Sequence, residues 1–181
     1  LISGGSVLPD YGAVLFDEAH QVEDVASHYL GMEISNFALE RFLSTLHNTR
    51  TGRGLYSAFS YVGPELSKEL RDRTAEMRLR AKTLFDAILD KYPGKNERVR
   101  IRQPAQGEPQ TLEGMKDLIG TLERFKKEVT EEQDKAEVDV ALGVAEDISR
   151  RLETILKQKR ADAVYWLEVD RGTGRLNPEA E

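Results

Sequence analysis

The sequence predicts a mainly α-helical domain of long antiparallel helices, with short strands near its two ends. Across residues 36–160, apolar residues recur mostly every three or four positions, which is the period of an amphipathic helix. Proline and glycine divide this stretch into segments that are long enough to be separate helices. Near both ends, shorter apolar runs are typical of strands instead.

An apolar run at Ala13–Phe16 predicts a buried strand, and a helical pattern follows over about Val22–Leu30. The next helix is predicted over Asn36–His47, where Ser35 is suited to be the N-cap. Its apolar stripe consists of Leu39, Phe42, Leu43 and Leu46.

The longest helix is predicted after a glycine-containing loop over His47–Gly63. It runs over about Pro64–Tyr92, because Pro64 suits a first helical turn and Pro93-Gly94 ends the pattern. The residues of its apolar stripe are Leu66, Leu70, Met77, Ala81, Leu84, Phe85, Ile88 and Leu89.

A break over Pro93–Thr111 separates this helix from the next, since it holds three of the six prolines. Within it, arginines alternate with Val99 and Ile101, which predicts a short extended piece. Further helices are predicted over Leu112–Lys135 and Val138–Arg160; they could equally be one helix with a kink. The buried faces are expected to be Met115, Leu118, Ile119, Leu122, Phe125 and Val129 in the first, and Ala141, Leu142, Ala145, Ile148, Leu152, Ile155 and Leu156 in the second.

The chain is expected to end in a strand over Ala163–Val169 and a turn over Asp170–Gly174. The turn has the composition of half a hairpin, whose second strand would begin at Arg175. Tyr165 and Trp166 are expected to pack in the core or in an interface of this strand.

Two adjacent carboxylates follow the first apolar run, in the tetrapeptide Asp17-Glu18-Ala19-His20. Ligands of open α/β sheets bind at the carboxyl ends of strands, and a Walker-B aspartate of this kind helps to hold Mg²⁺ beside a nucleotide. A second acid beside it can orient or deprotonate the attacking water. The alternative is a strand-to-helix turn whose acids only cap the helix.

The wider stretch Leu8–Ala26 resembles the DEAH-box region of the DinG/XPD-type superfamily 2 DNA helicases. The segment Tyr165-Trp166-Leu167-Glu168 resembles the point where such chains return to the motor domain after a helical insertion, the arch. The resemblance implies a RecA-like motor fragment over residues 1–30, an arch over 31–160 and a returning strand and turn over 161–181. The helices between match the family in pattern only.

The resemblance implies part of an ATP-dependent DNA helicase for DNA repair, with an arch that helps to enclose single-stranded DNA. In it, Asp17 would hold the Mg²⁺ of Mg-ATP through water, Glu18 would position and activate the hydrolytic water, and His20 would couple hydrolysis to the DNA-bound state. Many family members carry an iron–sulfur cluster, whose ligands precede the DEAH box. A cluster is therefore possible in the parent protein, but not in this chain, which has no cysteine.

No P-loop sequence and no arginine-bearing helicase motif follows or precedes the acids, and the chain does not begin with methionine. We interpret it as a piece of a larger motor, inactive alone, whose remaining motor domains belong to the same polypeptide. The alternative is a non-catalytic helical protein-interaction module in which Asp17–His20 is only a turn. A P-loop upstream in the complete gene product would distinguish the two.

Composition adds further expectations. A net charge of −6 argues against a chain built wholly to coat nucleic acid. No apolar stretch approaches the roughly 20 residues of a membrane helix, and no signal peptide is visible. We therefore expect a cytoplasmic protein with no membrane partner.

Three basic groups could contact single-stranded DNA, because single-strand channels combine positive charge with stacking aromatics. The favoured group is Arg98, Arg100 and Arg102, which alternate in an extended piece. The second group is Arg150, Arg151, Lys157, Lys159 and Arg160 on the last helix. The third is Arg50 and Arg53, in a loop with Tyr56, Phe59 and Tyr61. The alternative is that these charges are solubilising and the aromatics belong to the core.

Overall fold

The computed structural model describes residues 12, 13, 15, 17–22, 31–92, 98–103, 108–160 and 162–169. The chain divides into two compact units, Leu1–Met32 and Glu33–Glu181. The described part of the first unit contains one short 3₁₀ helix, η1 (Ala19–Gln21). The predicted helix over Val22–Leu30 lies outside the described residues apart from Val22, which is helical.

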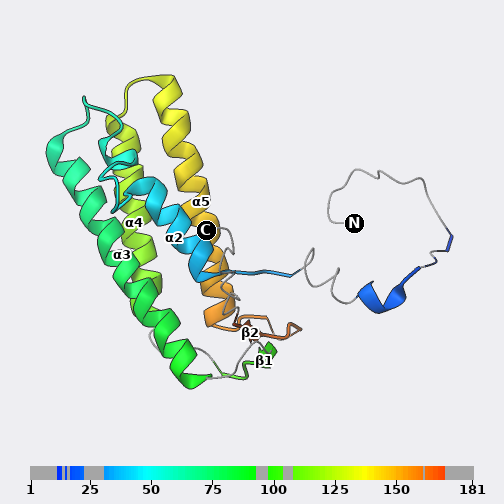
Figure 1. The fold of residues 1–181 in the computed structure, drawn as a ribbon. Coiled ribbons are helices and arrows are strands. Elements are labelled where there is room, and N and C mark those ends of the chain that lie inside the picture. Colours follow the sequence, from blue (N-terminus) through cyan, green and yellow to red (C-terminus); the bar gives the residue numbers. More distant parts are fainter. Residues whose placement is uncertain are drawn as a thin grey trace, which may run out of the picture. The chain divides into compact units, whose positions relative to one another are not determined.

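Four α-helices form a bundle in the described part of the second unit, which confirms the mainly α fold (Figure 1). They are α2 (Asn36–Leu46), α3 (Pro64–Lys91), α4 (Glu108–Glu128) and α5 (Glu132–Leu156). The colour gradient in Figure 1 shows that α3, α4 and α5 alternate in direction. Helix α4 contacts both α3 and α5, while α2 packs against α3 and also touches α5. None of the described helices is long and apolar enough to cross a membrane.

Helix α2 has the boundaries and the cap that its sequence predicts. The Ser35 hydroxyl oxygen accepts a hydrogen bond from the Ala38 N–H at 3.1 Å, which satisfies one of the free donors at the helix start. All four members of the predicted stripe are buried. The stripe therefore faces the bundle along the whole of α2.

Helix α3 begins at Pro64, in its first turn. The N–H that proline lacks would have no hydrogen-bond partner within the helix at this position, so its absence does not destabilise the helix. Its stripe is buried as far as Leu84, while Leu89, at the far end, is 40% exposed. The Thr74 hydroxyl is also buried and donates to the Leu70 carbonyl at 2.7 Å, so it leaves no unsatisfied donor in the core. In the loop before α3, Leu55–Ser57 form a second 3₁₀ helix, η2.

The prediction of two separate helices after residue 111 is confirmed, and the alternative of one kinked helix is wrong, because α4 ends at Glu128 and α5 begins at Glu132. The predicted end of the third helix at Lys135 is wrong for the same reason. Both helices carry an apolar stripe that must reach the same core, and a straight continuation would carry the second stripe away from it. Val129 lies buried in the corner between them.

Strands β1 (Arg98–Arg100) and β2 (Trp166–Glu168) pair antiparallel, which confirms the extended piece around Val99. Strand β2 is shorter than the predicted Ala163–Val169, and its partner is β1. The turn and second strand expected beyond Asp170 lie outside the described residues.

The strand predicted over Ala13–Phe16 is not formed at its described residues, Ala13 and Leu15. Leu15 is 98% exposed, so burial of this run is also wrong at that position. The described part of the first unit offers no neighbouring strand to accept the backbone hydrogen bonds that such a run requires. Val14 and Phe16 lie outside the described residues.

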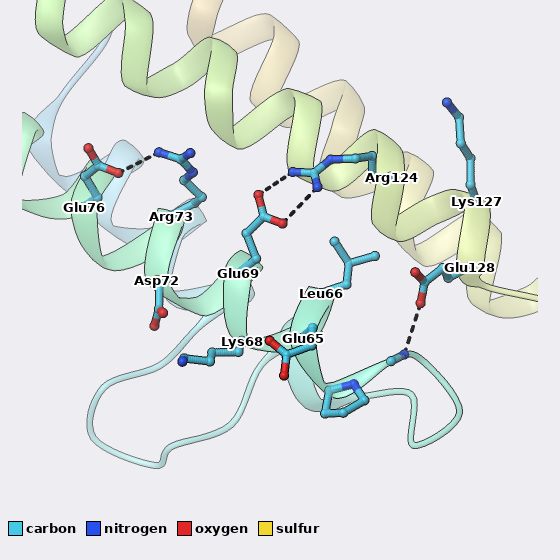
Figure 2. Close-up of a pocket in the computed structure, with 12 residues that line it drawn as sticks. Glu65, Leu66, Lys68, Glu69, Asp72, Arg73, Glu76, Arg124, Lys127 and Glu128 are labelled. Atoms are coloured by element: carbon cyan, nitrogen blue, oxygen red, sulfur yellow. Dashed lines mark hydrogen bonds and ion pairs between the residues drawn. The ribbon is translucent and has the colours of Figure 1, made fainter.

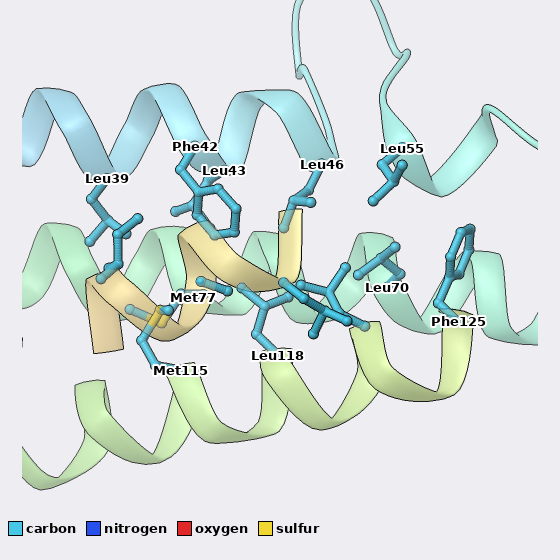
Figure 3. Packing of buried hydrophobic residues seen from close by; sticks show 14 of the residues in the cluster. Leu39, Phe42, Leu43, Leu46, Leu55, Leu70, Met77, Met115, Leu118 and Phe125 are labelled. Atoms are coloured by element: carbon cyan, nitrogen blue, oxygen red, sulfur yellow. The ribbon is translucent and has the colours of Figure 1, made fainter. Parts of the chain in front are cut away.

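One apolar cluster unites the four helices, and Figure 3 shows part of it. Side chains from α2, α3 and α4 meet in it, with Leu55 of η2 and residues of α5. Members with no more than 2% exposure include Leu39, Leu43, Leu46, Leu70, Met77, Leu118, Leu122, Phe125 and Leu152.

Leu70→Ala should destabilise the chain by about 2–5 kcal/mol, because it removes a fully buried side chain and leaves a cavity. Leu79→Ala is the matched control on the same helix, since Leu79 is 66% exposed; it should cost less than about 0.5 kcal/mol. Urea unfolding followed by circular dichroism measures both. Equal losses in the two variants would contradict the packing described.

Candidate functional site

Asp17 and Glu18 lie in a turn that leads directly into η1. Glu18 has φ 51° and ψ 46°, in the left-handed region that side chains other than glycine rarely adopt. Its carbonyl accepts a hydrogen bond from the Gln21 N–H at 2.8 Å, which closes the first turn of η1. Backbone conformations of this kind gather at functional sites.

The three polar side chains of the motif are exposed and make local contacts. Asp17 Oδ1 accepts the Glu18 N–H at 2.9 Å, and His20 Nδ1 lies 3.2 Å from Glu18 Oε2. The Glu18 side chain makes no capping hydrogen bond to η1. A purely capping role predicts such a bond, so the observed geometry counts against that alternative for Glu18.

These carboxylates suit a hydrated divalent cation. Mg²⁺ keeps several waters and is held in proteins by one or two carboxylates together with substrate phosphates. Exposed oxygens of Asp17 and Glu18 provide that donor set. The described residues contain no group of three or more His, Cys, Asp or Glu side chains placed to hold a metal by themselves.

The second basic group is neutralised by carboxylates of its own surroundings. Arg150 and Arg151 both pair with Asp147, and Arg151 also donates to the Glu33 carbonyl at 3.3 Å. Lys157 and Lys159 lie 3.2 and 3.0 Å from Glu153 Oε1. Arg160 forms an ion pair of 2.8 Å with Asp162.

The carboxylates in these pairs are held in their charged form. Hydrogen bonds from Lys159 and then Lys157 lower the pKa of Glu153, and those from Arg160 lower the pKa of Asp162. A DNA phosphate would have to compete with these acids for the cations. The structure therefore makes this group a weaker candidate for a DNA contact.

The aromatic residues of the third basic group are used for packing. Phe59 is buried with its ring centroid 6.1 Å from that of Phe125, and the Tyr56 hydroxyl donates to the Gly52 carbonyl at 2.7 Å. The Tyr61 hydroxyl donates to Asp134 at 2.5 Å. Phe59 therefore belongs to the core, Tyr56 is half-buried, and Tyr61 stays 46% exposed with its hydroxyl bound to Asp134.

Arg98 and Arg100 of the favoured group lie in β1, whose register brings an aromatic residue beside Arg100, and Arg102 follows the strand by two residues. Arg100 is paired across the ribbon with Trp166, and Arg98 occupies the position opposite Glu168. The Arg98 side chain lies outside the described part of the structure. Arg100 and Arg102 are exposed, and neither forms an ion pair in that part.

Trp166 is 40% exposed, so it does not lie in the core, and the expected packing of Trp166 in an interface stays a prediction. Tyr165 does pack: it is half-buried, and its hydroxyl oxygen accepts the Arg160 N–H at 3.0 Å. Alternation in each strand could have indicated which residues share a face, but the partner strand and its register are not readable from local sequence.

A shallow cleft of about 840 Å³ lies between the start of α3 and the end of α4 (Figure 2). Its charged groups largely satisfy one another. Glu69 accepts two hydrogen bonds from the Arg124 guanidinium, Arg73 pairs with Glu76, and Glu128 accepts the Gly63 N–H at 3.1 Å. The Arg124 hydrogen bonds lower the pKa of Glu69, and the same pairing raises the pKa of Arg124. The Glu69–Arg124 pair links α3 to α4, and both side chains are occupied by one another and not available to a ligand.

Comparison with protein-family models, with curated proteins and with solved structures found no match to this chain.

The Glu69–Arg124 pair should make stability depend on pH. Because the pKa of Glu69 is lowered in the folded state, its contribution is present above the unfolded value near 4.3 and is lost as the pH falls through the folded value. Both side chains are partly exposed, so the contribution should be about 0.5–1 kcal/mol.

Glu69→Gln should therefore lose less stability than the unmodified chain between pH 6.5 and pH 3, measured by urea unfolding. Glu65→Gln, which changes an exposed carboxylate on the same helix, is the control and should behave as the unmodified chain does. An unchanged acid sensitivity in Glu69→Gln would show that the pair contributes nothing.

Proposed function

We propose that this chain is part of an ATP-dependent DNA helicase of the DinG/XPD type. It would contribute the acids of the DEAH box and a helical arch that helps to enclose single-stranded DNA. Two features support the proposal: the sequence Asp17-Glu18-Ala19-His20 after an apolar run, and the mainly helical region that follows it. The remaining motor domains would supply the P-loop and the arginine-bearing motifs.

The observation that carries the proposal is the exposed Asp17-Glu18 turn. In the complete enzyme, Asp17 would hold Mg²⁺ and Glu18 would orient and deprotonate the hydrolytic water. The bound ion would neutralise charge on the β- and γ-phosphates. His20 Nδ1 lies 3.2 Å from a Glu18 carboxylate oxygen. A movement of His20 would therefore change the electrostatic surroundings of Glu18, the proposed base. This contact supports a coupling role for His20.

A helical protein-interaction module is the second candidate. Large apolar side chains on the helices favour it, because Phe37 is 82% exposed, Val140 68% and Leu79 66%. Such side chains mark interaction surfaces when they form contiguous patches. In this case Asp17–His20 would have no catalytic role.

The 181-residue chain alone should not hydrolyse ATP, because it contains no P-loop to hold the phosphates. In the complete protein, Glu18→Gln should lower kcat by about 10²–10⁴-fold, the range expected for loss of a general base. ATP affinity should change little, since the amide keeps the shape of the side chain. Steady-state ATPase assays and nucleotide-binding titrations measure the two quantities.

Glu33→Gln is the matched control, since Glu33 is an exposed carboxylate outside the motif. It should leave kcat unchanged. Normal turnover by Glu18→Gln would remove Glu18 from the mechanism. A complete protein with neither a P-loop nor ATPase activity would favour the interaction module.

A further inference from the structure

We propose that the two-stranded ribbon of β1 and β2 is a single-strand DNA contact in which a base stacks on Trp166 while Arg100 and Arg102 bind phosphates. The inference deepens the proposed function and rests on it for the identity of the nucleic acid. It names a surface that lies wholly within the second unit, formed by two segments more than 60 residues apart in the sequence.

The register places Arg100 and Trp166 together. Residues directly opposite one another in an antiparallel pair project from the same face. The Ile101 N–H donates to the Tyr165 carbonyl at 2.9 Å, next to the Arg100–Trp166 pair. This hydrogen bond makes Arg100 and Trp166 a non-hydrogen-bonded pair, the type in which facing side chains approach most closely. A guanidinium group and an indole ring thus share one face of the ribbon.

Exposure and charge favour a nucleic-acid ligand for this face. Trp166 keeps 40% of its surface exposed in a strand whose neighbours Tyr165 and Leu167 are half-buried. Arg100 and Arg102 are exposed and form no ion pair in the described part of the chain, whereas the cations at the end of α5 are held by Asp147, Glu153 and Asp162. A phosphate can therefore approach the ribbon arginines without displacing a carboxylate from either of them.

Single-stranded DNA fits this combination better than an acidic peptide does. The arginines would serve either ligand, but an indole ring that is partly exposed beside them offers a stacking surface, which only the bases exploit fully. Glu168 lies on the same face, opposite Arg98, and adds one negative charge to it. The charges that define the contact are consequently those of Arg100 and Arg102.

The chain provides its own probe, because Trp166 is its only tryptophan. Titration with an oligo(dT) strand should quench the tryptophan fluorescence, and the quenching should saturate together with binding measured by fluorescence anisotropy of a labelled strand. An abasic strand of equal length keeps the phosphates and lacks the bases. It should bind more weakly and should not quench.

Trp166→Ala should weaken binding about 5- to 100-fold, as expected for the loss of one base-stacking contact. Trp166→Phe keeps an aromatic face and should retain most of the affinity, which separates stacking from a folding defect. Arg100→Ala/Arg102→Ala should flatten the slope of log affinity against log salt by about 1.4, since each phosphate contact on a single strand contributes about 0.7. Arg50→Ala/Arg53→Ala removes two exposed charges elsewhere and should change neither quantity.

Equal binding of abasic and oligo(dT) strands, or an unchanged salt slope in Arg100→Ala/Arg102→Ala, would overturn the inference. So would equally tight binding of polyglutamate, which would make the ribbon an acidic-peptide site. If the ribbon fails these tests while the complete protein still requires Glu18 for ATP hydrolysis, only the inference fails. If the chain binds DNA as described and the complete protein has no ATPase activity, the proposed function fails and the ribbon contact stands.

Discussion

Packing between α3 and α4 is the interaction on which the other elements depend. The two helices bury Leu70, Met77, Leu118 and Leu122 against one another and against their neighbours, each with no exposed surface. In proteins, most of the stability of a helix comes from packing of its amphipathic face, so α3 and α4 depend on the face that they share. Burial of each such side chain contributes about 1.5–3 kcal/mol. Helices α2 and α5 then have an apolar surface on which to pack.

Close approach of α3 and α4 also depends on Gly114. A Cβ atom at this position would lie 2.9 Å from Arg80 Cδ and 3.2 Å from Met77 Sδ. Charged pairs across the same seam, Glu69 with Arg124 and Arg73 with Asp117, add specificity more than stability, because they are partly exposed. Pairing of charges at the end of α5 contrasts with β1, where Arg100 has no ion pair in the described part of the chain.

Local signals in the sequence predicted the parts of the fold whose causes are local. The cap at Ser35, the proline start of α3 and the apolar stripes all depend on residues within one or two helical turns. The position of the break between α4 and α5, after Glu128 and not after Lys135, was not predicted, because it depends on the core that both flanking helices must reach. Pairing of β1 with β2 joins segments far apart in the chain, and no local pattern specifies it.

The candidate sites also divide into features that local sequence predicts and features that depend on distant segments. The motif at Asp17–His20 was visible as a tetrapeptide, whereas the position of Trp166 beside Arg100 required the register of two strands. The charge pairing of the second basic group could have been predicted. Asp147 precedes Arg150 and Arg151 by three and four residues, a spacing that pairs charges on a helix, so the neutralisation of that group was readable from the sequence.

The turn at Asp17 and Glu18 is maintained by contacts within five residues, from the Asp17 carboxylate to the Gln21 N–H. It therefore needs no neighbouring sheet to present its carboxylates, although a strand before it would need one. A phosphate cradle has no such local origin, because its backbone donors come from a separate loop. The acid turn and the ribbon lie in different compact units, each with its own internal contacts. Water activation and DNA contact, as proposed, thus rest on separate parts of the chain.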